Sequence, residues 1–163
     1  MTIREIRVDE ELWQQTTALR RAEWRATIED LVHDGQLSPK YDGYFVLVKV
    51  SPDAAELEFL DDEGELRGAV TVPFAITAHL LSEYLQIITR MDSEAHETGR
   101  LEALDMGKKV VHDAAARALQ QALPELAANH ATYRKLFSML VALQVDTTKL
   151  IHARAHMFRT QEP

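Results

Sequence analysis

The segment Tyr44-Phe-Val-Leu-Val-Lys-Val50 consists almost entirely of β-branched, aromatic and long apolar residues, which are typical of a strand. Ser51-Pro-Asp53 follows as a turn, because a proline cannot donate to a central ladder. Glu56-Leu-Glu-Phe-Leu60 then alternates charged and apolar residues, and Leu66–Val72 is a third strand-like stretch after a loop that contains Gly64. The sequence therefore predicts a three-stranded antiparallel meander.

Before the meander, the sequence predicts a strand and a helix. Ile3–Val8 alternates apolar and charged residues, as a short half-buried strand does. Asp9 is a typical N-cap, and apolar residues then recur at helical spacing as far as Val32. We expect one long amphipathic helix from Asp9 to Val32, ended by Gly35.

After the meander, three helices are predicted. Apolar residues recur at helical spacing over Ala75–Met91, Leu101–Leu123 and Ala131–Leu143, the last continuing toward the C-terminus. Strands thus cluster first and helices follow, so the fold class is α+β. We expect a short N-terminal strand, a long helix, a three-stranded antiparallel meander, and then three helices packed on the sheet.

The composition limits the kinds of protein to which this chain can belong. The chain has 163 residues, 27% charged and 46% apolar, with a formal net charge of −8. We expect a single domain over residues 1–163, with residues 146–163 as a helical extension or tail. The absence of cysteine excludes disulfides, cysteine-ligated metals and thiol catalysis. The first residues lack the apolar region of a signal peptide, and no stretch approaches the roughly 18 apolar residues of a membrane span, so we expect a cytoplasmic protein.

Charge is unevenly distributed along the chain. Residues 1–98 hold 9 basic and 20 acidic residues, whereas residues 99–163 hold 9 basic and 6 acidic ones. Binding to DNA or RNA requires clustered lysine and arginine. Because the basic surplus here is small and scattered over predicted helices, the sequence disfavours a nucleic-acid partner and indicates a solvated, mildly dipolar surface.

The best-defined candidate for a catalytic site lies on a predicted helix, in the segment Asp105-Met-Gly-Lys-Lys-Val-Val-His-Asp113. Asp105 and His112 are seven residues apart and so project from the same side of the helix, about 10 Å apart along its axis. With Lys108 or Lys109 between them, an acid, a base and a proton carrier share one face. Asp105, Lys109 and His112 are therefore candidate catalytic residues, with Tyr84 of the preceding helix as an additional member.

The same segment has a structural interpretation. Gly107 costs about 1 kcal/mol relative to alanine inside a helix, and close approach of a neighbouring element is the plainest reason to retain it. On this interpretation Gly107 is a packing notch, and Asp105 and His112 are polar groups that fasten helix or strand ends. No motif for a nucleophile accompanies the segment.

Two other groups of residues have metal-ligand character. His152 and His156 are four residues apart, the spacing of a helical metal chelate, but no third ligand can be placed and a solvated or partner-facing helix end is the alternative. The acidic loop Asp61–Glu65 lacks the ligand spacing of a calcium-binding EF-hand, which favours a solvated turn. Phosphate-cradling glycine motifs are absent, and we expect no cofactor.

The last predicted helix has a broad apolar face that is wide enough to pack against the sheet and to touch a second chain. A simple core helix is the alternative interpretation. The candidate partner-binding residues lie on this helix and its extension: Tyr133, Phe137, Met139, Leu140, His152, Arg154 and His156.

Leu104-Asp-Met-Gly-Lys-Lys-Val-Val-His-Asp113 resembles a segment of a small uncharacterised proteobacterial protein family, number 262 of the UPF series. Similar pieces of that family correspond to Val72-Pro-Phe74 and to Tyr133-Arg-Lys-Leu-Phe-Ser138, and the resemblance extends to about Val145. Asp113 stands where the family usually has asparagine. The resemblance implies a fold and a candidate site at Asp105, Gly107 and His112, and it implies no established reaction.

Two functions remain open on the sequence alone. The first is a non-enzymatic cytoplasmic regulator or adaptor that acts by binding another protein or a second copy of itself. The alternative is a small hydrolase or ligand-binding enzyme that uses the cluster Asp105, Lys108, Lys109 and His112. The surroundings of His112 discriminate between them, because an enzyme requires a concave pocket at that residue.

Overall fold

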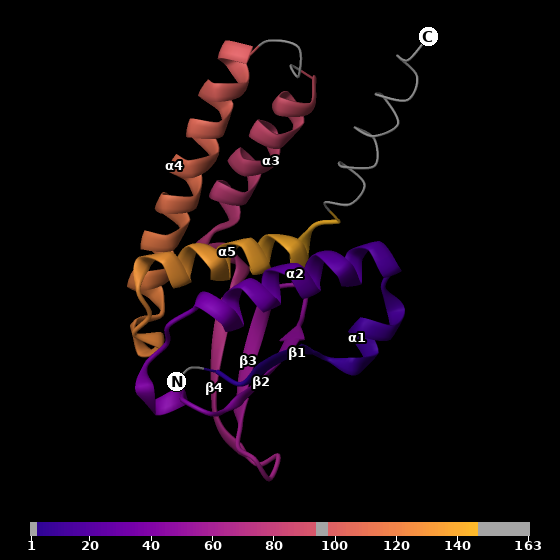
Figure 1. The fold of residues 1–163 in the computed structure, drawn as a ribbon, viewed down its shortest axis with the longest axis vertical. Helices are drawn as coiled ribbons and strands as arrows, with labels where there is room; N and C mark the ends of the chain where they lie inside the picture. The colour runs from indigo at the N-terminus through magenta and orange to yellow at the C-terminus, as the bar shows by residue number, and fades with distance from the viewer. Residues whose placement is uncertain (1–2, 94–97, 147–163) are drawn as a thin grey trace.

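Four strands form one mixed sheet in the computed structural model, which describes residues 3–93 and 98–146 (Figure 1). The sheet order is β1 (Glu5–Val8), β2 (Phe45–Val50), β3 (Ala54–Leu60) and β4 (Leu66–Pro73). The predicted antiparallel meander of β2, β3 and β4 is confirmed. β1 joins its edge parallel to β2, so the sheet is mixed and not wholly antiparallel. The parallel pairing requires a crossover connection, which the helices between β1 and β2 provide.

Strand alternation places one set of apolar side chains on the inner face of the sheet. Val8, Val48, Leu57 and Val70 are aligned across the four strands, and all four are buried. Successive residues of a strand point to opposite faces, so the polar and charged residues between them face outward. This pattern creates one face that must be covered by helices.

The predicted long helix from Asp9 to Val32 is wrong in one respect, because two helices occupy this region. α1 (Glu10–Gln15) is followed by α2 (Ala18–Asp34). Thr17 adopts an extended conformation, and its side-chain oxygen accepts a hydrogen bond from the backbone N–H of Arg20 at 3.2 Å. Such an N-cap begins a new helix.

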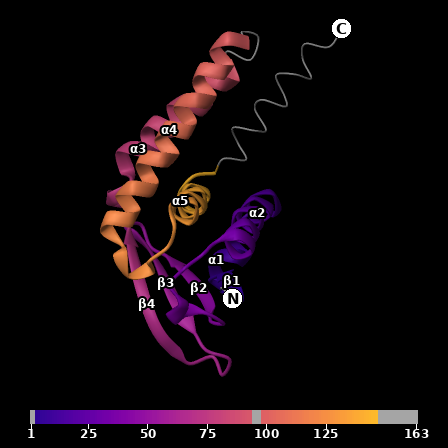
Figure 2. The same ribbon diagram turned by 60° about the vertical axis from the view of Figure 1, so that its left-hand side comes forward.

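The three C-terminal helices are confirmed as α3 (Ala78–Ser93), α4 (Thr98–Ala122) and α5 (His130–Gln144). α2 and α5 lie side by side over the inner face of the sheet, while α3 and α4 form a long hairpin that extends beyond it (Figure 2). Short 3₁₀ turns connect the elements at Pro39–Tyr41, Phe74–Ile76 and Pro124–Leu126. The α+β class is therefore correct, and α5 with α2 forms the main helical cover of the sheet.

The α2 region forms hydrogen bonds with both ends of α5. At its start, Asn129 accepts a hydrogen bond from the Thr132 backbone N–H at 2.8 Å, and the Thr132 hydroxyl accepts one from the N–H of Gln36. At its end, the Trp24 indole N–H donates to the carbonyl of Ala142 at 2.8 Å. Because helix ends leave backbone groups without intrahelical partners, these bonds fix α5 in position over the sheet.

Gly35 ends α2 as predicted, but the reason is space and not backbone conformation. Its φ of −72° is open to any residue, whereas an added Cβ would lie 2.1 Å from the carbonyl oxygen of Leu31. We expect Gly35→Ala to lower the free energy of unfolding by about 2 kcal/mol, because backbone must shift. Urea unfolding followed by circular dichroism measures this, with Gly68→Ala as the control, since nothing lies within 4 Å of that Cβ position. Equal unfolding midpoints for the two variants would contradict the account.

None of the helices within the described residues combines the length and the apolar content that crossing a bilayer requires. The predicted extension over residues 146–163 lies, from residue 147 onward, outside the described residues.

Candidate functional site

His112 of α4 is half-buried at the junction of α3, α4 and α5. Its ring makes edge contacts with Tyr84 of α3, with centroids 5.1 Å apart, and with Phe137 of α5, at 5.2 Å. Nδ1 lies 3.0 Å from the carbonyl oxygen of Lys108, and Nε2 lies 3.3 Å from the hydroxyl of Ser138. These contacts favour the tautomer in which Nδ1 carries the proton and donates to the carbonyl, which leaves Nε2 as an acceptor.

The surroundings of His112 favour its neutral form. Burial lowers the pKa of His112 below its ordinary value, and the positive charges of Lys108 and Arg134 add to this effect. The hydrogen bond to the Lys108 carbonyl and the charge of Asp113 oppose it. Since burial is the largest cause, the ring is a neutral polar group held between helices.

The lowered pKa of His112 predicts a loss of stability in mild acid. Below the ordinary histidine pKa of about 6.5, the unfolded chain binds a proton that the folded chain resists, so the free energy of unfolding falls as the pH decreases. We expect urea unfolding between about pH 7 and pH 5 to show this decrease, and His112→Gln to show less of it. Replacement of the exposed His79 by glutamine is the matched control. An unchanged pH dependence in His112→Gln would contradict the role assigned to burial.

The structure does not unite the predicted catalytic cluster. Asp105 forms an i,i+4 ion pair with Lys109 at 3.3 Å, with both side chains more than half exposed. Lys108 contributes its backbone carbonyl to His112. The partners of His112 come from α3 and α5, and Asp105 is not among its hydrogen-bond partners within the described residues. Of the sequence-predicted set, His112 and Tyr84 are in contact with each other.

Asp113 forms a second polar cluster, which the sequence interpretation missed. Its carboxylate lies 3.0 Å from Nε2 of His130 and 3.4 Å from Nε of Arg134, both on α5. The hydrogen bond with His130 lowers the pKa of Asp113, and the charge of Arg134 acts in the same direction. This cluster connects α4 to α5 at the surface, which is a fastening role of the kind predicted for Asp105 and His112.

Gly107 faces α3 but has room for a side chain. An added Cβ would contact only Cδ1 of Ile87, at the ordinary separation of 3.5 Å. We therefore expect Gly107→Ala to raise the free energy of unfolding by about 0.5–1 kcal/mol, the helix propensity difference between the two residues. Thermal and urea unfolding measure this change, and a destabilised variant would show that the α3–α4 seam needs the glycine after all.

The assignment of α5 to a partner-binding surface is corrected. Its four candidate residues are at most 1% exposed and belong to the core of the protein: Tyr133, Phe137, Met139 and Leu140. The apolar face predicted for this helix packs against the sheet and the neighbouring helices. The other three candidates, His152, Arg154 and His156, lie outside the described residues, and so does the predicted two-histidine metal site.

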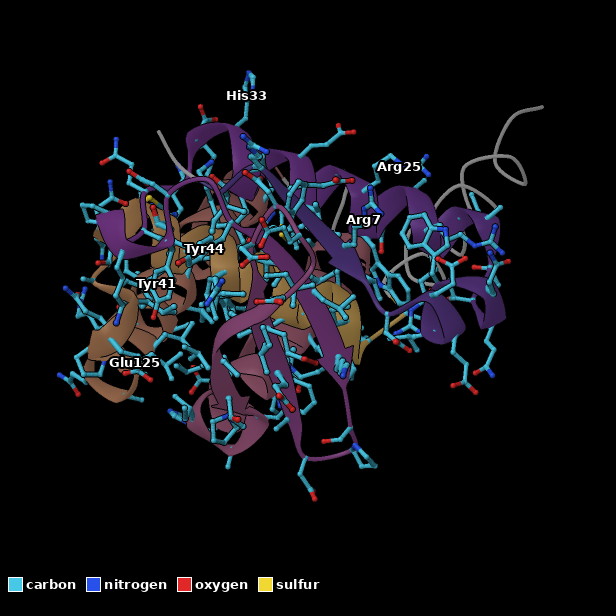
Figure 3. All side chains as sticks on the ribbon, turned by 90° about the horizontal axis from the view of Figure 1, so that it is seen from below. Arg7, Arg25, His33, Tyr41, Tyr44 and Glu125 are labelled. Carbon is cyan, nitrogen blue, oxygen red and sulfur yellow. The ribbon has the colours of Figure 1, made fainter. Side chains whose placement is uncertain are left out.

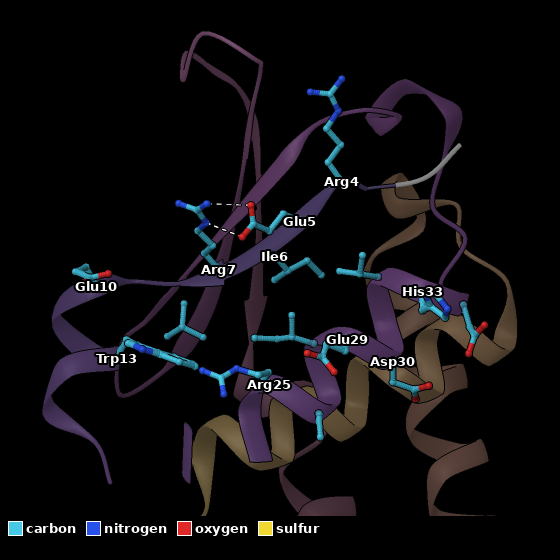
Figure 4. Close-up of a pocket in the computed structure, with 15 residues that line it drawn as sticks. Arg4, Glu5, Ile6, Arg7, Glu10, Trp13, Arg25, Glu29, Asp30 and His33 are labelled. Carbon is cyan, nitrogen blue, oxygen red and sulfur yellow. Dashed lines mark hydrogen bonds and ion pairs between the residues drawn. The ribbon is translucent and has the colours of Figure 1, made fainter. Parts of the chain in front are cut away.

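A groove of about 1010 Å³ lies between β1 and α2 (Figure 4). Figure 3 places Arg7 of β1 and Arg25 and His33 of α2 along this side of the molecule. The apolar lining of the groove comes from α1, β1 and α2: Trp13, Ile6, Val8, Ile28 and Val32.

The rim of the groove carries charges of both signs. Arg7 binds Glu5 through two hydrogen bonds of 2.8 and 3.1 Å, and the guanidinium of Arg25 lies 5.4 Å from the ring centroid of Trp13. Glu29 lines the same groove. Such a rim does not favour a ligand of one strong charge, such as a phosphate, and it is compatible with a polypeptide of mixed charge.

β1 forms one wall of the groove and is the terminal strand of the sheet. The backbone N–H of Asp9 donates to the carbonyl of Val48 at 2.9 Å, and Val8 is the register partner of Val48. In a parallel pair this geometry directs the backbone groups of Arg7 and Asp9 toward β2. By the same alternation, the N–H and C=O groups of Ile6 and Val8 point away from β2, toward the open edge.

A family model described as an uncharacterised protein family, UPF0262, matches residues 1–146. The chain belongs to the UPF0262 family. No curated protein and no solved structure matches it.

The UPF0262 match includes every element that forms the groove, the His112 junction and the Asp113 cluster, and it ends where the described residues end. The resemblance inferred from the Asp105–Asp113 segment is thereby confirmed. The candidates His152, Arg154 and His156 lie beyond the part of the chain that the family model covers.

The acidic loop of this UPF0262 protein has a structural explanation. Asp61 accepts hydrogen bonds from the backbone N–H groups of Glu63 and Glu65, each at 2.9 Å, and pairs with Arg67 at 2.7 Å. These bonds lower the pKa of Asp61, with the backbone donation from Glu65 as the largest cause. The loop thus has the geometry of a self-capped turn.

Proposed function

We propose that this protein is a cytoplasmic, non-enzymatic module of the regulatory or adaptor kind, which binds an extended polypeptide segment along β1. The observation that carries the proposal is the groove of about 1010 Å³ between an edge strand and α2. A groove with these two walls suits strand addition, in which an extended segment bonds to the strand and packs beneath the helix.

The backbone and the side chains of the groove support the same mode of binding. Ile6 and Val8 direct backbone donors and acceptors toward the open edge, which suits a segment in β conformation. Alternate side chains of an added strand would lie beside the partly exposed apolar residues of the lining, Trp13 of α1 and Val32 of α2. We therefore expect the bound segment to carry apolar residues at every second position.

The enzyme alternative receives less support from the geometry. Asp105 and Lys109 bind each other at an exposed site, and the contacts of His112 are those of a neutral side chain packed between helices. The groove between β1 and α2 is remote in the sequence from the Asp105–His112 segment and includes none of its residues.

Peptide selection with a blocked groove tests the proposed function. Random ten-residue peptides displayed on phage are selected against the full chain, and binding of the best synthetic peptides is measured by fluorescence polarisation. Ala26 lines the groove and is exposed, so Ala26→Trp fills the groove without disturbing the core. Ala22 is also exposed on α2 but is not among the groove-lining residues, so Ala22→Trp is the matched control.

We expect peptides with alternating apolar residues, binding to Ala26→Trp at least about tenfold more weakly, and unchanged binding to Ala22→Trp. Peptides that bind Ala26→Trp as well as they bind the natural protein would show that the groove is not the binding site.

A further inference from the structure

The two charged residues of β1, one acidic and one basic, lie at equal distances along the strand from Ile6. Glu5 and Arg7 stand on either side of Ile6, and their side chains are 42% and 72% exposed. Ile6 is buried toward α2, so by strand alternation Glu5 and Arg7 share the outer face of the sheet. An acidic and a basic residue at equal distances from a centre become complementary when the same strand is placed antiparallel to itself.

The backbone of β1 permits this pairing at one position. Only Ile6 and Val8 direct their N–H and C=O groups toward the open edge, and only Ile6 has strand residues on both sides. If Ile6 lies opposite Ile6 of a second copy, the two residues exchange a pair of backbone hydrogen bonds. Centring on Val8 instead would require the second strand to run into α1, which begins at Glu10.

The Ile6-centred register brings opposite charges together twice. Glu5 of each copy lies across from Arg7 of the other, in the antiparallel position where side chains approach most closely. The pair that joins Glu5 and Arg7 within one chain, through two hydrogen bonds, can then be exchanged for pairs between chains. Exposed pairs of this kind set register and partner choice more than affinity.

Resting on the proposed function of the groove, we propose that the segment bound along β1 is β1 of a second copy of this chain. The two four-stranded sheets then continue across a two-fold axis at Ile6. The groove beneath each α2 becomes a shared cleft, closed on its open side by the second copy.

A charge exchange tests the proposed partner. The full chain and its variants are studied by sedimentation equilibrium over a range of concentrations. Glu5→Arg alone and Arg7→Glu alone each place like charges opposite each other twice, and we expect each to weaken the dimer at least about tenfold. The double variant Glu5→Arg/Arg7→Glu restores opposite charges, and we expect it to dimerise like the natural protein. Lys109→Glu, a charge reversal on α4 away from β1, is the control and leaves dimerisation unchanged.

Circular dichroism checks the folding of all four variants, and we expect each to be folded because the substituted side chains are exposed. A natural protein that is monomeric at every concentration would overturn the inference, and so would a dimer that is insensitive to the single changes or is not restored in the double variant.

The test separates this inference from the proposed function. In the first outcome, the natural protein is a monomer, and the selected peptides bind it but fail to bind Ala26→Trp. That outcome would support the proposed function of the groove and reject a second copy as its partner. In the second outcome, the dimer is weakened by each single charge reversal and restored in the double variant, while Ala26→Trp affects neither dimerisation nor peptide binding. That outcome would support the pairing of β1 with a second copy and reject the proposed function of the groove.

Discussion

Replacement of Phe137 by alanine is expected to lower the free energy of unfolding by about 3–5 kcal/mol, the range for deleting a fully buried aromatic side chain. Phe137 is 0% exposed, and its ring makes edge contacts with Tyr84 at 6.1 Å and His112 at 5.2 Å. Its removal leaves a cavity at the junction of α3, α4 and α5 and deprives two aromatic neighbours of favourable contacts.

Urea unfolding monitored by circular dichroism measures this loss. Phe137→Leu retains most of the buried volume and should lose less stability than the alanine variant. Met106→Ala removes a large apolar side chain that is 61% exposed and should change the free energy by no more than about 0.5 kcal/mol. A change below about 1 kcal/mol in Phe137→Ala would show that α5 is not the core helix described here.

Trp24→Ala is expected to lower the free energy of unfolding by about 3–5 kcal/mol, as much as Phe137→Ala. Trp24 is 1% exposed, its indole N–H donates to the carbonyl of Ala142, and the guanidinium of Arg20 lies 5.2 Å from its ring centroid. Arg20 also donates to the carbonyl of Leu143 at 3.2 Å. Ala142 and Leu143 lie in the last turn of α5, so Trp24 and Arg20 together satisfy carbonyls that the helix leaves unpaired.

Comparison with Trp24→Phe separates packing from hydrogen bonding. Phenylalanine keeps most of the apolar volume but leaves the Ala142 carbonyl without its donor, which should cost about 1–3 kcal/mol. If Trp24→Phe were as destabilised as Trp24→Ala in urea unfolding, packing of the ring would contribute little and the assignment of Trp24 to the core would be wrong.

The fold was largely predictable because apolar and polar residues alternate along its strands. Tyr44–Val50 and the two strands after it carry strong strand patterns, and their antiparallel pairing follows from short turns between them. The break between α1 and α2 was not predictable from periodicity, because the apolar spacing continues through Thr17 while its side chain caps a new helix. The parallel addition of β1 depends on where the crossover returns the chain, which local sequence does not specify.

The candidate site was predictable only in part. The spacing of Asp105 and His112 placed both on one side of α4, but what surrounds each residue depends on helices distant in the sequence. His112 meets Phe137 and Ser138 of α5, whereas Asp105 remains at the exposed surface with Lys109. For the same reason, the apolar face of α5 could be recognised from periodicity, but whether the sheet or a partner covers it could not.

The groove had no sequence signature. Its walls come from β1 and α2, and Trp13 and Arg25 come together only because the break between α1 and α2 redirects the chain. The charges of Glu5 and Arg7 were visible as strand alternation, yet their significance depends on β1 being the terminal strand, which is a property of the assembled sheet.

Hydrogen exchange at the backbone amide of Ile6 tests most directly whether the edge of β1 accepts an added strand. Measured by nuclear magnetic resonance at concentrations where the natural protein self-associates, the Ile6 amide should exchange slowly, and it should exchange rapidly in the Glu5→Arg variant. The amide of Val46, inside the sheet, should stay protected in both proteins. Equally rapid exchange at Ile6 in the natural protein and in the variant, with Val46 still protected, would contradict the account.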